Sequence, residues 1–210
     1  MRDIPAVPDH DIELSGGALA LDFANTVGGT HVQPTHDHLR SYADIVRFTE
    51  LADGLDGPTA KRLARRAEQD PRRAAAVYEL GIALREAIWG VFSAIASGEA
   101  PRDADLALIG DAAAAGRARE RLVYDRSGVG WSLPADGDAL ERPLWEIASS
   151  AADVLTSAEL DRVKECASDT CEWVFLDRSR NRSRRWCDMS DCGNRAKARR
   201  FQAKTRAARV

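Results

Sequence analysis

Four cysteines, the only ones in the chain, lie within 27 residues of one another near the C-terminus. Cys166, Cys171, Cys187 and Cys192 follow the spacing C-x4-C-x15-C-x4-C. A tight turn can supply two thiolates to a tetrahedral Zn²⁺, and a second such turn completes the set of ligands. Because four thiolates leave no open position, we expect one structural Zn²⁺ and not a catalytic ion.

Disulfides or buried thiols are the alternative for these cysteines. The chain has no run of about 18 apolar residues, so we expect no transmembrane helix. The N-terminal stretch "MRDIPAVPDHDIEL" lacks the apolar core of a signal peptide. These features favour a cytoplasmic protein that does not bind membranes, where clustered cysteines more often hold metal than form disulfides. The absence of a C-x2-C pair argues against a redox role.

The net charge of −3 hides an asymmetry along the chain. Residues 1–160 carry 16 basic and 26 acidic side chains, whereas residues 161–210 carry 14 basic and 7 acidic ones. A basic segment attached to an acidic body is typical of nucleic-acid-binding proteins. We therefore expect duplex DNA as the main partner, with phosphate contacts releasing counterions and arginine able to bind guanine edges. The candidate nucleic-acid-binding residues are Arg178, Arg180, Arg182, Arg184, Arg185, Arg195, Lys197, Arg199, Arg200 and Lys204.

This positive charge also fits three roles besides binding to duplex DNA. The arginines could form a solvated face, or one or two of them could offset the net negative charge of a four-thiolate zinc site. The basic module could bind RNA. It could also bind an acidic protein, which would make the chain an interaction adaptor.

The segment from residue 161 to residue 210 predicts a treble-clef-like zinc finger, with a β-hairpin and a helix. "WVFL" and "RRW" are candidate strands, and "DRSRNRS" between them suits a turn. If this segment is extended, its even-numbered arginines share one face. The helix follows Cys192, with Phe201 turned toward Trp173 or Trp186. A module this small has too little apolar core to fold alone, so zinc should be required.

Residues 1–160 predict a mainly α-helical domain with a small β-hairpin at residues 120–134. Helices are expected within residues 16–29, 39–54, 57–71, 71–99, 103–122 and 138–155, with a loop at residues 30–39. The strongest apolar stripe at helical spacing comprises Val77, Leu80, Leu84, Ala87 or Ile88, Val91 and Ile95.

Three segments of the chain resemble parts of two known bacterial domains. "CGNRAKARRF", after the C-x4-C pair, resembles the CGNR zinc finger. "LALDFANTV" and "LRSYADIVRF" resemble the opening of the ABATE domain that precedes this finger. The resemblance covers nearly the whole chain and implies a stress-induced transcription regulator.

The helical domain has two groups of polar residues that could carry a function. Asp22, Asn25 and Thr26 could line the pocket of a small-molecule effector, or could make internal hydrogen bonds that stabilise the fold. His31, His36 and His38 could bind metal or titrate near neutral pH, or be incidental residues of a surface loop.

Neither catalysis nor oligomeric state has a clear signature in the sequence. No glycine-rich phosphate loop, HExxH or GxSxG motif is present, so we expect no enzymatic activity. Symmetric regulators are commonly dimers, so a homodimer is one expectation, although no segment of the sequence identifies an interface.

Overall fold

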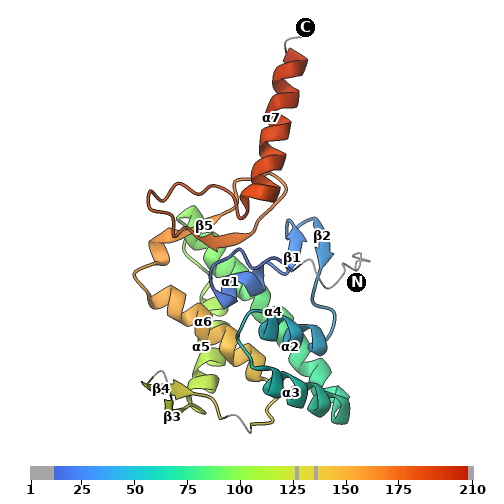
Figure 1. The fold of residues 1–210 in the computed structure, drawn as a ribbon, viewed down its shortest axis with the longest axis vertical. Helices are drawn as coiled ribbons and strands as arrows, with labels where there is room; N and C mark the ends of the chain where they lie inside the picture. Colours follow the sequence, from blue (N-terminus) through green and yellow to red (C-terminus); the bar gives the residue numbers. More distant parts are fainter. Residues whose placement is uncertain (1–11, 126–127, 135–136, 208–210) are drawn as a thin grey trace.

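A computed structural model of the chain describes residues 12–125, 128–134 and 137–207. Helices form most of this part, and its strands form three separate antiparallel pairs (Figure 1). The elements are α1 (Leu19–Ala24), β1 (Val27–Gly29), β2 (Pro34–Asp37), α2 (Tyr42–Leu51), α3 (Gly57–Gln69), α4 (Pro71–Ser97), α5 (Asp103–Arg117), β3 (Arg121–Asp125), β4 (Gly128–Ser132), α6 (Arg142–Thr156), the 3-10 turn η2 (Leu160–Arg162), β5 (Val163–Glu165), β6 (Val174–Leu176), the π-helical turn η3 (Met189–Gly193) and α7 (Asn194–Ala207).

The helices begin and end where local chemistry favours it. The side chains of Ser41, Asp56 and Asp70 accept hydrogen bonds from the first free amides of α2, α3 and α4, respectively. Gly98 ends α4 in the left-handed conformation, with φ of 76°, which glycine adopts without a steric penalty. Each segment of residues 1–160 that was predicted to be helical contains a helix, but within residues 16–29 the helix is only Leu19–Ala24, and Val27–Gly29 form strand β1.

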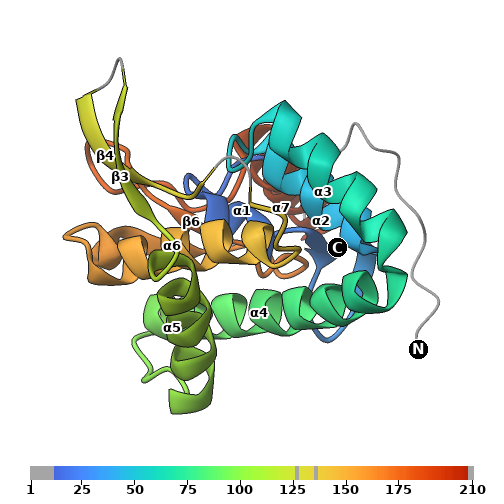
Figure 2. The ribbon, with the colours of Figure 1, turned by 90° about the horizontal axis from the view of Figure 1, so that it is seen from below.

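Helix α4 lies along one side of the helical body, and α1, α2, α5 and α6 pack against it (Figures 1 and 2). Val77, Leu84, Ile88 and Val91 are buried, as the apolar stripe predicts. Leu80 is 48% exposed, so its place in that stripe was wrong. The buried face of α4 instead includes Gly81, where an added Cβ would lie 2.5 Å from Ile45 Cδ1 of α2.

By length and composition, α4 is the one described helix that would suffice to cross a membrane. Its buried residues belong to the main hydrophobic core, together with residues of α1, α2 and α6. A helix with one face in a hydrophobic core passes the same test of length and composition, so the test by itself does not indicate a membrane span.

The expected hairpin is present, with Leu122 of β3 paired to Trp131 of β4. It projects from the body beside the α5–α6 pair (Figure 2). Residues 30–39 are not simply a loop, because β2 pairs with β1. The sequence hides this pairing, since the bulge between Gly28 and Gly29 and Pro34 at the strand start weaken the alternating pattern.

The hairpin predicted inside the finger was wrong. Strand β6 pairs with β5, which precedes the first cysteine, and residues 184–187 form no strand. Val163, Val174 and Leu176 of this pair belong to the same core cluster as α1 and α4. The cysteine segment is therefore joined to the helical body through shared apolar packing.

Candidate zinc centre and its basic surface

The four cysteine side chains converge on one point. Their Sγ atoms all lie within 4.8 Å of one another, and all four residues are buried. Cys187 Sγ lies 3.7 Å from Cys171 Sγ and 3.6 Å from Cys192 Sγ. Zinc–sulfur bonds of about 2.3 Å at tetrahedral angles place sulfurs about 3.8 Å apart, whereas a disulfide requires about 2.05 Å. The arrangement fits one structural Zn²⁺.

Backbone hydrogen bonds hold both cysteine pairs in turns. In the first pair, the Cys166 amide donates to the Trp173 carbonyl at 2.9 Å, and the Cys171 amide donates to the Ser168 carbonyl at 3.0 Å. In the second pair, the Asp188 carboxylate accepts from the amides of Ser190 and Asp191 and so begins η3. Hydrogen bonds within the chain therefore determine the shape of the two turns that carry the cysteine pairs.

Asn194 and Arg195 support the second cysteine pair. Asn194 Nδ2 donates to the Ser190 carbonyl at 2.8 Å and so stabilises the turn that precedes α7. Arg195 Nη2 lies 2.9 Å from Cys192 Sγ and 2.9 Å from Asp191 Oδ2. A guanidinium at this sulfur offsets part of the negative charge of a four-thiolate site, as expected for one or two of the arginines.

Asn25 connects the helical body to the zinc finger. Its side chain donates to the Val174 carbonyl at 2.9 Å and accepts from the Val174 amide at 3.0 Å, and it is 2% exposed. Thr26 donates to the Phe23 carbonyl. Nearby, Trp173 Nε1 donates to the Val27 carbonyl at 2.7 Å. The polar groups of Asn25 and Thr26 therefore make internal hydrogen bonds. This is the second of the two interpretations given for these residues, the first being that they line an effector pocket.

Asp22 is also buried, and its Oδ1 accepts from the Gly16 amide at 2.7 Å. Burial raises the pKa of Asp22 to about 6, against the lowering effects of the Gly16 amide and the Arg184 guanidinium. The Asp22 carboxyl group therefore loses its proton near pH 6 in the folded protein.

Asp177 organises the arginine-rich loop, a role that the sequence pattern does not reveal. This buried carboxylate accepts from Lys164 Nζ at 2.6 Å, from the Ser179 amide at 3.0 Å and from the Arg184 amide at 2.9 Å. Burial alone would raise the pKa of Asp177, but these hydrogen bonds lower it below its ordinary value. The loop therefore curls around one acidic group, and its even-numbered arginines do not share an extended face.

The arginines of this loop divide into inward and outward groups. Arg184 donates to the carbonyls of Ser15, Trp186 and Cys187, and its guanidinium lies 4.3 Å from the Phe175 ring centroid. Arg178 pairs with Glu159, and Arg182 pairs with Asp161. The Arg184 side chain is therefore used in hydrogen bonds and packing within the protein, whereas the ion pairs of Arg178 and Arg182 lie at the surface.

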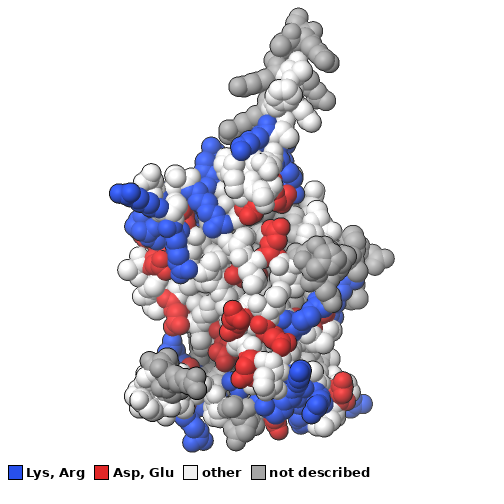
Figure 3. Space-filling view, in the orientation of Figure 1, with Lys and Arg blue, Asp and Glu red and all other residues white. Residues whose placement is uncertain are grey.

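Four further cations of the finger are exposed: Arg180, Arg185, Lys197 and Arg199. The side chains of Arg180 and Lys197 make no hydrogen bond or ion pair with any residue that the structure describes. Arg185 lies over the Trp186 ring at 5.4 Å, and Arg199 Nη2 donates to Ser168 Oγ at 3.2 Å. Figure 3 shows lysine and arginine side chains gathered over the finger and the base of α7.

Helix α7 extends away from the rest of the molecule (Figure 1). Phe201 on this helix is 73% exposed, so the prediction that it packs against Trp173 or Trp186 was wrong. Both tryptophans instead cover the cysteine cluster without it. The side chains of Arg200 and Lys204 lie outside the described residues.

The three histidines do not converge on a metal site in the described structure. His31 Nδ1 lies 2.8 Å from Glu86 Oε2, and its ring stacks on Trp89 with centroids 3.6 Å apart. Trp89 Nε1 in turn donates to the Glu172 carbonyl of the finger at 2.9 Å. His36 and His38 contact each other edge to face. His31 therefore takes part in the contact between body and finger.

The fold and the site together define a helical protein that carries a four-cysteine zinc finger on one end. Residues 17–158 match the ABATE family, described as "Putative stress-induced transcription regulator", and residues 162–205 match the CGNR zinc finger. The chain belongs to the ABATE family, with a CGNR zinc finger after the family's domain. A search of curated proteins finds no match.

Proposed function

We propose that this protein is a zinc-dependent transcription regulator that binds duplex DNA through its finger. The observation that carries the proposal is the set of exposed cations on the arginine-rich loop and on the first turns of α7, in a module whose shape the cysteines determine. The description of the ABATE family supports a regulatory role in a stress response. The proposal places this role in the bacterial cytoplasm and assigns no catalytic activity to the protein.

Helix α7 has a suitable length and exposure to enter the major groove of DNA. Its 14 residues span about 21 Å at 1.5 Å per residue, and it projects without a covering element (Figure 1). The major groove of DNA admits one α-helix. Lys197 and Arg199 near its start, with Arg180 and Arg185 from the loop, would contact phosphates on either side of the groove.

Selection from a random duplex library by the zinc-loaded protein, followed by affinity measurements over a range of salt, tests this function. The triple variant Arg180→Ala/Arg185→Ala/Lys197→Ala should lower the affinity and reduce the log–log salt slope by about 2–3, since each lost phosphate contact removes about 0.9. The matched control is Lys61→Ala/Arg65→Ala/Arg72→Ala, which removes three exposed cations of the helical body. Equal slopes for the two variants would refute the proposed surface.

RNA and an acidic protein are the competing partners. Tighter binding of a single-stranded or hairpin RNA than of any selected duplex would favour the first. A protein recovered after nuclease treatment, and lost in the triple variant, would favour the second.

We also propose that the regulator works as a homodimer through the β3–β4 hairpin. Cross-strand pairing places Leu122, Tyr124, Val129 and Trp131 on one face, and each of them is at least 60% exposed. A two-stranded hairpin is marginal in water without a packed face, and this uncharged face suits a second copy of itself. Two copies would bury on the order of 1,000 Å², near the lower limit of a specific interface. Trp131→Ser should give a monomer by sedimentation; a monomeric wild type, or a variant that is still a dimer, would refute this interface.

A further inference from the structure

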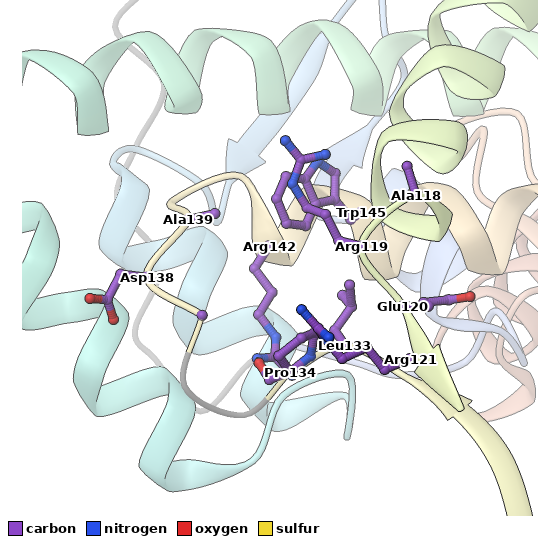
Figure 4. A pocket seen from close by; sticks show the side chains of 11 residues that line it. Ala118, Arg119, Glu120, Arg121, Leu133, Pro134, Asp138, Ala139, Arg142 and Trp145 are labelled. Atoms are coloured by element: carbon purple, nitrogen blue, oxygen red, sulfur yellow. The ribbon is translucent and has the colours of Figure 1, made fainter. Parts of the chain in front are cut away.

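A cavity of about 550 Å³ lies where the end of α5, the hairpin β3–β4 and the start of α6 meet (Figure 4). Its volume is within the range of sites for small organic molecules. Leu133, Ala139 and Trp145 give it an apolar wall. The described lining contains no residue of the zinc centre, so the cavity is a separate feature of the helical body.

Three arginines also line this cavity, and two of them have unused donors. The side chain of Arg121 is exposed and makes no hydrogen bond or ion pair with a described residue. The Arg142 side chain is 11% exposed, and its Nη1 donates to the Pro134 carbonyl at 2.6 Å. Its Nε is buried without a hydrogen-bond partner among the described residues. Arg119 lies over Trp145, with the guanidinium 4.4 Å from the ring centroid.

Three carboxylates lie near these three arginines, and none of the three accepts a hydrogen bond from Arg121 or Arg142. Glu146 Oε1 lies 3.8 Å from Arg142 Nε, close enough for an ion pair but too far for a hydrogen bond. Asp138 lines the cavity but lies 3.4 Å from Arg62 Nε. Glu120 is the other acidic residue of the described lining. The exposed Arg121 guanidinium has no acceptor among these described residues, so the cavity favours an incoming anion.

We propose that this cavity binds a small organic carboxylate with an apolar, ring-sized body. The carboxylate would accept hydrogen bonds from the exposed guanidinium of Arg121, because the planar guanidinium matches its two oxygens, and would lie beside the buried Arg142 guanidinium. The apolar body would contact Leu133, Ala139 and Trp145. A single negative charge suits the site better than a phosphate dianion, since Glu120 and Glu146 lie close by. This binding does not depend on whether the finger binds DNA.

The test titrates the zinc-loaded full-length protein with 1-naphthoate and, separately, with the neutral isostere 1-naphthamide, by calorimetry. The acid should bind at least tenfold more tightly than the amide. Arg121→Gln should weaken binding of the acid about tenfold, since it removes a charged donor. The matched control Arg72→Gln removes an exposed arginine of α4 that lies outside the cavity, and should leave binding unchanged.

A second readout does not depend on the stability of a variant. In the ¹⁵N-labelled wild-type protein, the Nε–Hε resonance of Arg142 should shift on addition of 1-naphthoate and stay in place with 1-naphthamide. Equal affinity for acid and amide, no binding of either compound, or binding of the acid that Arg121→Gln does not alter would each overturn the proposal. A failure of DNA binding in the same protein leaves these outcomes unaffected.

Discussion

The contact between Asn25 and Val174 predicts a large cost when Asn25 is replaced by alanine. Both hydrogen bonds are buried and join α1 to the zinc finger. The change leaves the amide and the carbonyl of Val174 without partners, at about 1–3 kcal/mol for each group. We expect the free energy of unfolding to fall by about 3 kcal/mol. The affinity for Zn²⁺ should fall as well, by up to about a hundredfold if finger docking and metal binding are fully coupled.

Urea denaturation followed by circular dichroism, with and without zinc, measures the first effect, and competition with a zinc-binding dye measures the second. Asn181→Ala, which changes an exposed residue of the arginine-rich loop, is the matched control and should have no effect. A stable Asn25→Ala protein with normal zinc affinity would refute the structural role of this residue. It would reopen the interpretation of Asn25 as part of an effector site.

Three further predictions follow from the same contacts. Removal of zinc by a chelator should abolish DNA binding while most of the helical circular dichroism of the body remains; coincident loss of all helical signal would contradict this. Arg184→Ala should lower the thermal midpoint, because hydrogen bonds to three backbone carbonyls and a cation–π contact are lost, whereas Arg180→Ala should weaken DNA binding at unchanged stability; differential scanning calorimetry and fluorescence anisotropy separate the two. For Asp22, the folded pKa of about 6 lies above the unfolded value of about 3.9, so its contribution to stability is present below pH 4 and is lost as the pH rises past 6. Asp22→Asn should remove about 3 kcal/mol of that dependence, and urea melts from pH 4 to 8 that superimpose on those of the wild type would contradict it.

The zinc ligands and the helices were predictable because the constraints that set them are local. A tetrahedral metal needs closely spaced pairs of cysteines, and a helix in a core needs an apolar stripe with capping residues at its end. Cys166 to Cys192 and the segments that became α2 to α6 satisfy these constraints within a few turns of chain. Such patterns can be recognised without knowing the tertiary structure.

The arrangement inside the finger was not predictable in the same way. Strand β6 had two possible partners at similar distance along the chain, and the short β5 carries no alternating pattern. The choice depends on the buried Asp177 carboxylate, which curls the following loop and prevents a strand at residues 184–187. The inward direction of Arg184 follows from that curl. A count of basic residues cannot distinguish an arginine that binds backbone carbonyls from one that faces solvent.

The two halves of the finger depend on zinc to different degrees. Strands β5 and β6 bury Val163, Val174 and Leu176 in the core of the helical body, and Asn25 binds Val174 directly. The turn that holds Cys187 and Cys192, and α7 after it, have no comparable apolar anchor among the described residues, since Phe201 is exposed. Zinc is therefore required chiefly to attach the second cysteine pair and α7 to a hairpin that the body already holds. The metal then determines where the basic helix points, which is the property that a DNA-binding surface needs.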